Sequence, residues 1–190
     1  MRLSRLSWFL APVTLITAAC GGQAEMARPA VHDVAPAEVK LSGGGTFGAP
    51  APRAAAIVYD RALVPPGASA RVTAESGAVL STAKVEVSGF LPRRTYGVHL
   101  HVNPCGADPE EAGPHYRQHG HSHASATSEV WLDFTTDRRG AATAAAKQDW
   151  AFIPGRPPRS LVIHAEPTRA EGTDAGAAGP RVACVTLAER

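Results

Sequence analysis

The sequence predicts an all-β domain, a sandwich or closed barrel of about eight strands. Three observations support this class: short apolar segments bounded by turn residues, apolar and polar residues alternating within them, and no good helical candidate. At 190 residues, with only 19% of them charged, the chain has room for one such core. The formal net charge of +2 is small and its cations are scattered, so neither a nucleic-acid surface nor an anionic-membrane surface is predicted.

Eight segments carry the strand pattern. The alternation is clearest in Lys84–Val87 and Val98–Val102, whereas the alanine-rich segment Ala141–Ala146 could equally be helical. Two connections are long, from Asn103 to Glu129 and from Glu166 to Pro180, and loops of this length in a compact domain are usually functional or disordered. The expected strands are Ala55–Tyr59, Ala68–Ala74, Ala83–Ser88, Tyr96–Val102, Val130–Thr135, Ala141–Ala146, Ser160–His164 and Arg181–Leu187.

The first twenty residues resemble an export signal. Two arginines precede an apolar run from Leu6 to Ala19 that is too short to span a bilayer as a stable helix. The run ends in Leu-Ile-Thr-Ala-Ala-Cys, which resembles a bacterial lipobox whose cysteine becomes diacylated. We therefore expect residues 1–19 to be a lipoprotein signal peptide and Cys20 to anchor the protein, through its lipid, to the outer face of the cell membrane. The alternative is an ordinary secretory signal with an incidental cysteine.

A flexible tether is expected between the lipid and the domain. Residues 20–54 are rich in glycine, alanine and proline and show no sustained apolar periodicity. The domain is therefore expected to span residues 55–190. His32, which falls in the tether, is assigned no role.

The cysteine count predicts one disulfide. With Cys20 bound to lipid, Cys105 and Cys184 remain as an even pair in an oxidising compartment. Their bond would close a loop of about eighty residues, and a closure of that size contributes roughly 4 kcal/mol in the loop-entropy model.

Two histidines on one predicted strand indicate a metal site. His99 and His101 are two residues apart, so their side chains share a face and can hold one ion. The pair alone is a weak signal, because imidazole binds copper, zinc, iron and nickel alike. His115 in the following loop, within Gly-Pro-His, and His164 at the end of a later strand strengthen it.

Taken in order, these motifs resemble those of Cu/Zn superoxide dismutases. Residues 55–187 contain His-Leu-His, a cysteine, Gly-Pro-His, a Pro-Gly-Arg turn before Val-Ile-His, and Ala-Gly-Pro-Arg-Val-Ala-Cys. The resemblance implies an eight-stranded Greek-key β-barrel, an immunoglobulin-like sandwich. It places the copper ligands at His99, His101, His115 and His164, the disulfide at Cys105 and Cys184, and the arginine that guides superoxide at Arg181.

The reaction implied by the resemblance is the copper-dependent dismutation of superoxide to dioxygen and hydrogen peroxide. Four imidazoles suit both oxidation states of copper. His115 would release reduced copper and deliver a proton to the departing peroxide. Arg181 would supply a fixed positive charge for the anionic substrate.

The zinc half of the family's site is incomplete in this sequence. His115 would bridge copper and zinc, and His123 stands at the family's spacing for the next zinc ligand. Where the family has a further histidine followed by Gly-Asp-Leu, residues Ser128–Phe134 read SEVWLDF, and neither Glu129 nor Asp133 falls at the family's aspartate. Because zinc requires four tetrahedral ligands, a copper-only site is expected.

Other conspicuous side chains have plainer interpretations. The tract containing His119, His121 and His123 either binds metal adventitiously, feeds copper to the site, or is a solvated loop. Trp131 and Trp150 are expected to pack in the core or at the end of the barrel.

Three functions remain open at this point. The first is a superoxide dismutase at the cell envelope. The second is a copper-binding or copper-delivery lipoprotein on the same fold, which the incomplete zinc site favours. The third is a structural envelope lipoprotein that has lost its metal. No oligomeric state is predicted.

Overall fold

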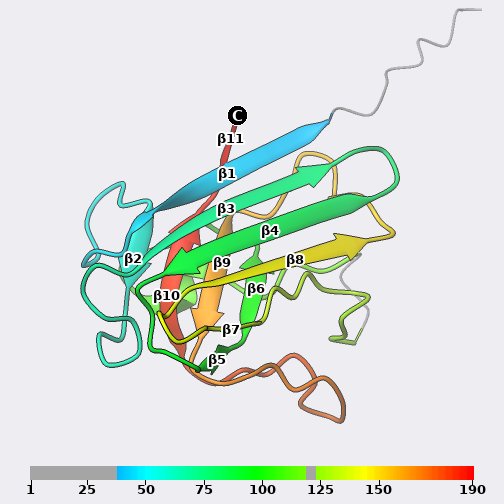
Figure 1. The fold of residues 1–190 in the computed structure, drawn as a ribbon. Helices are drawn as coiled ribbons and strands as arrows, with labels where there is room; N and C mark the ends of the chain where they lie inside the picture. The colour runs from blue at the N-terminus through cyan, green and yellow to red at the C-terminus, as the bar shows by residue number, and fades with distance from the viewer. Residues whose placement is uncertain (1–37, 119–122) are drawn as a thin grey trace, which may run out of the picture. The chain divides into compact units, whose positions relative to one another are not determined.

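The computed structural model describes residues 38–118 and 123–190, which form two layered antiparallel β-sheets and a two-stranded ribbon (Figure 1). The five-stranded sheet has the order β11-β1-β3-β4-β8, the four-stranded sheet has the order β2-β10-β9-β6, and β5 pairs with β7. The all-β prediction is confirmed. The strands are β1 (Val39–Thr46), β2 (Ala56–Val58), β3 (Ser69–Ser76), β4 (Ser81–Ser88), β5 (Thr95–Tyr96), β6 (Val98–His101), β7 (Phe134–Thr135), β8 (Ala142–Gln148), β9 (Ser160–His164), β10 (Arg181–Thr186) and β11 (Ala188–Glu189).

Strand β4 illustrates how the sequence produces the five-stranded sheet. Ala83, Val85 and Val87 are buried, while Lys84 and Glu86 between them are exposed. This pattern follows from the two-residue period of a strand, and burying a valine side chain contributes about 1.5–3 kcal/mol. One face of the sheet therefore lies on the core and the other faces solvent.

Strand β9 is buried on both faces. Leu161 and Ile163 belong to the main core between the sheets. Val162 points the other way and packs against Ala112 and Cys184 in a second, smaller cluster. Ala112 ends a short 3-10 helix, Pro109–Ala112, so this cluster holds the first long connection against the four-stranded sheet.

The alanine-rich segment whose structure was left open is a strand. β8 pairs with β4 along its whole length, from Ala142 opposite Val87 to Gln148 opposite Ser81. Alternate alanines of β8 pack against the core, so tertiary pairing outweighs their helix propensity. Trp150, just beyond it, is 7% exposed and stacks on Tyr116 with ring centroids 6.3 Å apart, which confirms its packing role.

The strand expected over Val130–Thr135 is shorter than predicted. Only Phe134 and Thr135 form β7, and Trp131 makes an isolated bridge with His99. The interruption has a local cause, because the Asp133 carboxylate takes the backbone N–H of Val98 at 2.9 Å. A side chain thus replaces a ladder hydrogen bond at this point.

The expected tether boundary is wrong, because the domain begins well before residue 55. Val39–Thr46 form β1, which pairs with β3 over all eight of its residues and also with β11. The strand escaped prediction because Gly43–Gly45 interrupt its apolar pattern. The glycines permit a close crossing, since a Cβ on Gly43 would lie 2.2 Å from the carbonyl oxygen of Thr186. The signal peptide, Cys20, His32, His119 and His121 lie outside the described residues.

No helix within the described ranges is long and apolar enough to cross a membrane. The two long connections between Asn103 and Glu129 and between Glu166 and Pro180 are found where predicted. Figure 1 shows the second as the orange loop that leaves β9 and returns to β10. The first contributes His115 to the histidine cluster described next, and both contribute hydrogen-bond partners to its rings.

We predict that a chain beginning at Ala55 will not fold, whereas a chain beginning at Glu38 will. Loss of β1 exposes one side of β3 and removes Leu41 and Phe47, which are 1% and 2% exposed. Truncating buried leucine and phenylalanine side chains costs about 2–5 kcal/mol each, against a typical domain stability of about 5–15 kcal/mol. Circular dichroism during heating measures the outcome, and cooperative melting of the shorter chain would contradict it.

Candidate metal centre

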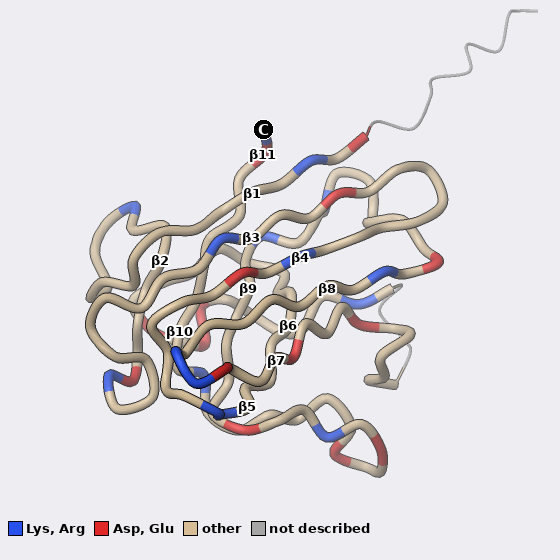
Figure 2. Tube along the Cα trace, viewed as in Figure 1, with Lys and Arg blue, Asp and Glu red and all other residues tan. Residues whose placement is uncertain are grey.

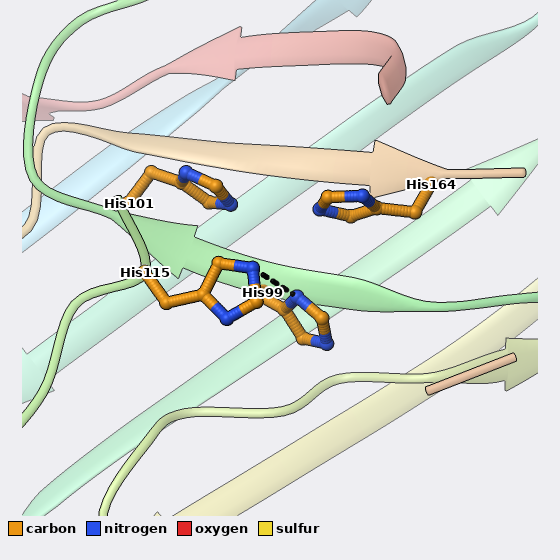
Figure 3. Close-up of side chains that lie close together, drawn as sticks. All are labelled: His99, His101, His115 and His164. Carbon is orange, nitrogen blue, oxygen red and sulfur yellow. Dashed lines mark hydrogen bonds between the residues drawn. The ribbon is translucent and has the colours of Figure 1, made fainter. Parts of the chain in front are cut away.

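Four histidines converge at the end of the four-stranded sheet (Figure 3). His99 and His101 come from β6, His164 ends β9, and His115 lies on a segment that bridges to His101. One nitrogen from each ring lies within 4.8 Å of the others. The three strand histidines are at most 4% exposed, and the side chain of His115 is 16% exposed. The structure therefore brings together all four predicted copper ligands.

Backbone carbonyls orient two of the rings. Nδ1 of His101 donates to the carbonyl oxygen of Gly113 at 2.9 Å, and Nδ1 of His164 donates to that of Gly179 at 3.0 Å. Each Nε2 must then carry a lone pair. Both Nε2 atoms are buried and have no hydrogen-bond partner among the described residues, so the rings leave two acceptors ready for a cation.

A hydroxyl and a carboxylate orient the third ring. Nε2 of His99 lies 2.7 Å from Oγ1 of Thr168, which donates in turn to Oδ1 of Asp133 at 2.7 Å. The backbone N–H groups of Thr168 and Val98 also bind this carboxylate, each at 2.9 Å. Because the Thr168 hydroxyl proton goes to Asp133, Nε2 of His99 is the donor and Nδ1 carries the lone pair.

Glu129 orients the fourth ring. Nδ1 of His115 donates to Oε2 of Glu129 at 2.8 Å, which leaves a lone pair on Nε2. That Nε2 lies 3.0 Å from Nδ1 of His99, the contact drawn dashed in Figure 3. Nε2 of His99 and Nδ1 of His115 are the protonated nitrogens, so the lone pairs on Nδ1 of His99 and Nε2 of His115 face each other. A cation between these two atoms relieves the repulsion. The donor set therefore fits a metal ion that prefers imidazole.

Burial keeps the strand histidines neutral. It lowers the pKa of His99 and of His101 well below the ordinary value of 6.5, and it lowers that of His164 to about 4. The neighbouring imidazoles of the cluster act in the same direction. Neutral imidazole is the form that binds metals, so near neutral pH these rings need no deprotonation before coordination.

Glu129 is a fully buried carboxylate with three donors. Besides His115, it accepts from Nε1 of Trp131 at 2.7 Å and from Nε of Arg117 at 2.5 Å. Burial raises its pKa, but the hydrogen bonds from His115, Trp131 and Arg117 outweigh it and leave the pKa below the ordinary value. The packing prediction for Trp131 therefore missed its polar role. Nothing in the sequence identified Trp131, Arg117 or Thr168 as partners of the cluster.

Arg181 is fixed beside the cluster. Its guanidinium donates to the carbonyl oxygens of Pro109 at 2.9 Å and Gly113 at 2.8 Å, and it lies 3.3 Å from the Glu110 carboxylate. The predicted disulfide is confirmed, with a Cys105–Cys184 sulfur–sulfur distance of 2.02 Å. It joins the loop that carries Gly113 to the strand that carries Arg181.

Comparison with known proteins identifies the family. The family model described as copper/zinc superoxide dismutase matches residues 68–187, a range that holds all four histidines and both bonded cysteines. The chain belongs to this family. It is similar to a protein named superoxide dismutase [Cu-Zn] from Neurospora crassa, with 30% identity over 129 residues that cover 58% of this chain and 81% of the relative.

A solved structure has a similar fold. The crystal structure of the clock protein EA4 matches with a TM-score of 0.52 and 15% identity, covering 80% of this chain and 94% of that one. This likeness concerns the sandwich alone. The predicted all-β sandwich is thereby confirmed.

Zinc, the second metal in the description of this family, has no comparable site in the described residues. The four-histidine group is the one set there of three or more histidine, cysteine or acidic ligands placed to hold an ion. His123 is exposed and outside it. Glu129 and Asp133, considered as replacement zinc ligands, instead bind His115 and Thr168.

We predict that the protein without bound metal loses stability as the pH falls from about 6.5 to about 4. Over this window the unfolded chain protonates histidines that the folded chain keeps neutral, so stability rises with pH. Each such histidine contributes a slope of about 1.4 kcal/mol per pH unit. Urea unfolding at several pH values measures the slope. His164→Gln should lower the slope of stability against pH by the contribution of one histidine. An equal slope in the variant and the unchanged protein would contradict the prediction.

Proposed function

We propose that this chain is a copper-dependent superoxide dismutase of the cell envelope whose site works without zinc. The observation that carries the proposal is the arrangement of the four imidazole rings. In each ring the nitrogen that points away from the cluster (the outer nitrogen) has a hydrogen-bond partner, and the other (the inner nitrogen) faces the inner nitrogens of the other rings. Membership of the superoxide dismutase family supports the reaction.

Copper is the metal that the ring arrangement and the reaction favour together. His99 would bind through Nδ1, and His101, His115 and His164 would bind through Nε2. Imidazole nitrogen is a suitable ligand for copper. Bound copper supplies one-electron chemistry, in which one superoxide loses an electron and leaves as dioxygen while a second gains it and leaves, with two protons, as hydrogen peroxide.

Glu129 prepares His115 to handle one of those protons. With its Nδ1–H donated to the carboxylate, the ring leaves Nε2 as the atom that can take up and release a proton. The same Nε2 faces the cluster, so the proton is held next to the place where peroxide forms. His115 is thus both a ligand and a proton donor.

Glu129 also supports a zinc-free site. In a complete enzyme of this family, the outer nitrogen of the bridging histidine would bind zinc. Here that nitrogen, Nδ1 of His115, donates to Glu129, whose other oxygen binds Arg117. The carboxylate thus supplies the orientation that zinc would supply.

The envelope location is proposed from the sequence. Residues 1–19 resemble a lipoprotein signal and Cys20 the lipidated cysteine. The Cys105–Cys184 disulfide is consistent with an oxidising compartment.

We predict that the protein offered both metals will retain one copper and little zinc, and will dismutate superoxide. Mass spectrometry gives the metal content and a dismutation assay gives the activity. His164→Ala should abolish activity, because it removes a ring that makes no contact with Glu129 and serves only the copper site.

The outcomes separate the candidate functions. Stoichiometric copper without activity would favour a copper-delivery protein. An equal content of zinc would refute the zinc-free site, and absence of copper would refute both enzyme and carrier.

We predict that Arg181→Gln will slow superoxide capture about tenfold at low ionic strength without emptying the metal site. The side chain is held by two backbone carbonyls and binds none of the four rings. Its replacement therefore removes a positive charge but no metal ligand. Pulse radiolysis gives the rate and mass spectrometry the copper content. A parallel loss of copper would contradict this role.

A further inference from the structure

The cluster opens to solvent through a hollow of about 520 Å³, which we call the mouth. Its lining includes His115 and His164 from the cluster and the uncharged loop Ala175–Gly179. Arg117 and Arg181 are the two charged residues in this lining. Arg181 is the residue expected to guide substrate, and Arg117 has no assigned role.

Three carboxylates near the mouth, none of them in its lining, oppose the entry of an anion. Glu129 lies 2.8 Å from His115, Asp133 lies 3.9 Å from Nε2 of His99, and Glu110 lies 3.3 Å from Arg181. Without Arg117, Arg181 would be the single arginine in the lining of the mouth to offset these three charges. Elsewhere, Figure 2 shows lysine and arginine interspersed with aspartate and glutamate, and the formal net charge is only +2, so distant charges provide no strong attraction.

Arg117 and Glu129 form an ion pair with its positive end toward solvent. Nε of Arg117 donates to Oε1 of Glu129 at 2.5 Å. The Arg117 side chain is 40% exposed, whereas that of Glu129 is fully buried. The rest of the guanidinium has no hydrogen-bond partner in the part of the chain that the structure describes. A molecule entering the mouth therefore meets the cation before the carboxylate.

We propose that Arg117 directs superoxide into the mouth by offsetting the Glu129 carboxylate. The proposal rests on the zinc-free site described above. Zinc beside His115 would place two positive charges near the substrate, whereas Glu129 places one negative charge there. Arg117 restores one positive charge at this end of the mouth and thereby complements Arg181.

A purely structural role for Arg117 makes a different prediction. Glu129 also holds donors from His115 and Trp131, so Arg117 is not its sole partner. If Arg117 only positioned Glu129, its loss would slow the enzyme equally at every ionic strength. An electrostatic role fades with salt, because charges act over roughly 30 Å at about 0.01 M and roughly 3 Å at about 1 M.

The test compares three variants of the copper-loaded full chain by pulse radiolysis across this range of ionic strength. Arg117→Gln removes the charge but keeps hydrogen-bonding capacity, and Arg117→Lys keeps the charge. Arg156→Gln is the matched control, since Arg156 lines, with Arg117 and His115, a neighbouring hollow that includes neither His164 nor Arg181. Optical titration with azide gives the affinity for an anion without turnover, and metal content is measured for every protein.

Arg117→Gln should lower kcat/KM and azide affinity by a factor on the order of three to ten at low salt, with rates converging at high salt. Arg117→Lys and Arg156→Gln should change them less than twofold. An equal deficit at every salt concentration, an unchanged azide affinity, or an equal effect of Arg156→Gln would overturn the proposal. Stoichiometric zinc would instead refute the zinc-free site, whereas copper alone with normal Arg117→Gln kinetics would refute only the role of Arg117.

Discussion

The arrangement of the site depends on one hydrogen bond at the outer nitrogen of each histidine. The sheet brings the rings together, but either nitrogen of an imidazole ring can carry the lone pair. The choice is fixed when the other nitrogen donates its proton in a hydrogen bond. Gly113 and Glu129 from the first long connection, and Thr168 and Gly179 from the second, supply those four bonds. The strands therefore place the histidines, and the long loops decide which atoms face inward.

The same constraint explains why a carboxylate beside His115 differs chemically from a metal. A cation on Nδ1 would require that nitrogen to lose its proton, whereas Glu129 requires it to keep the proton. Nδ1 of His115 thereby donates to Glu129, and Nε2 is the nitrogen left to face the cluster. The Glu129 carboxylate also places a negative charge near the path of an anionic substrate. Arg117 lies beside that carboxylate and offsets its charge.

Sequence periodicity could reveal most strands and the pair His99 and His101, because side chains alternate along a strand. His115 and His164 are found from the order of their motifs, which resembles that of the family. Periodicity could not reveal β1, where Gly43–Gly45 carry no side chains to alternate and serve a close crossing instead. Nor could it reveal the pairing of Thr168 with Asp133, which are 35 residues apart and meet only because two loops fold over one another. Glu129 could be recognised as a candidate ligand, but the direction of its carboxylate depends on the folded loop.

Gly113 links the covalent and the polar parts of the site. Its carbonyl oxygen accepts from both His101 and Arg181, so one backbone group orients a ligand and a guiding charge. The Cys105–Cys184 disulfide holds the loop that contains Gly113 against the strand that contains Arg181. The disulfide thus supports the geometry of the site as well as the stability of the domain.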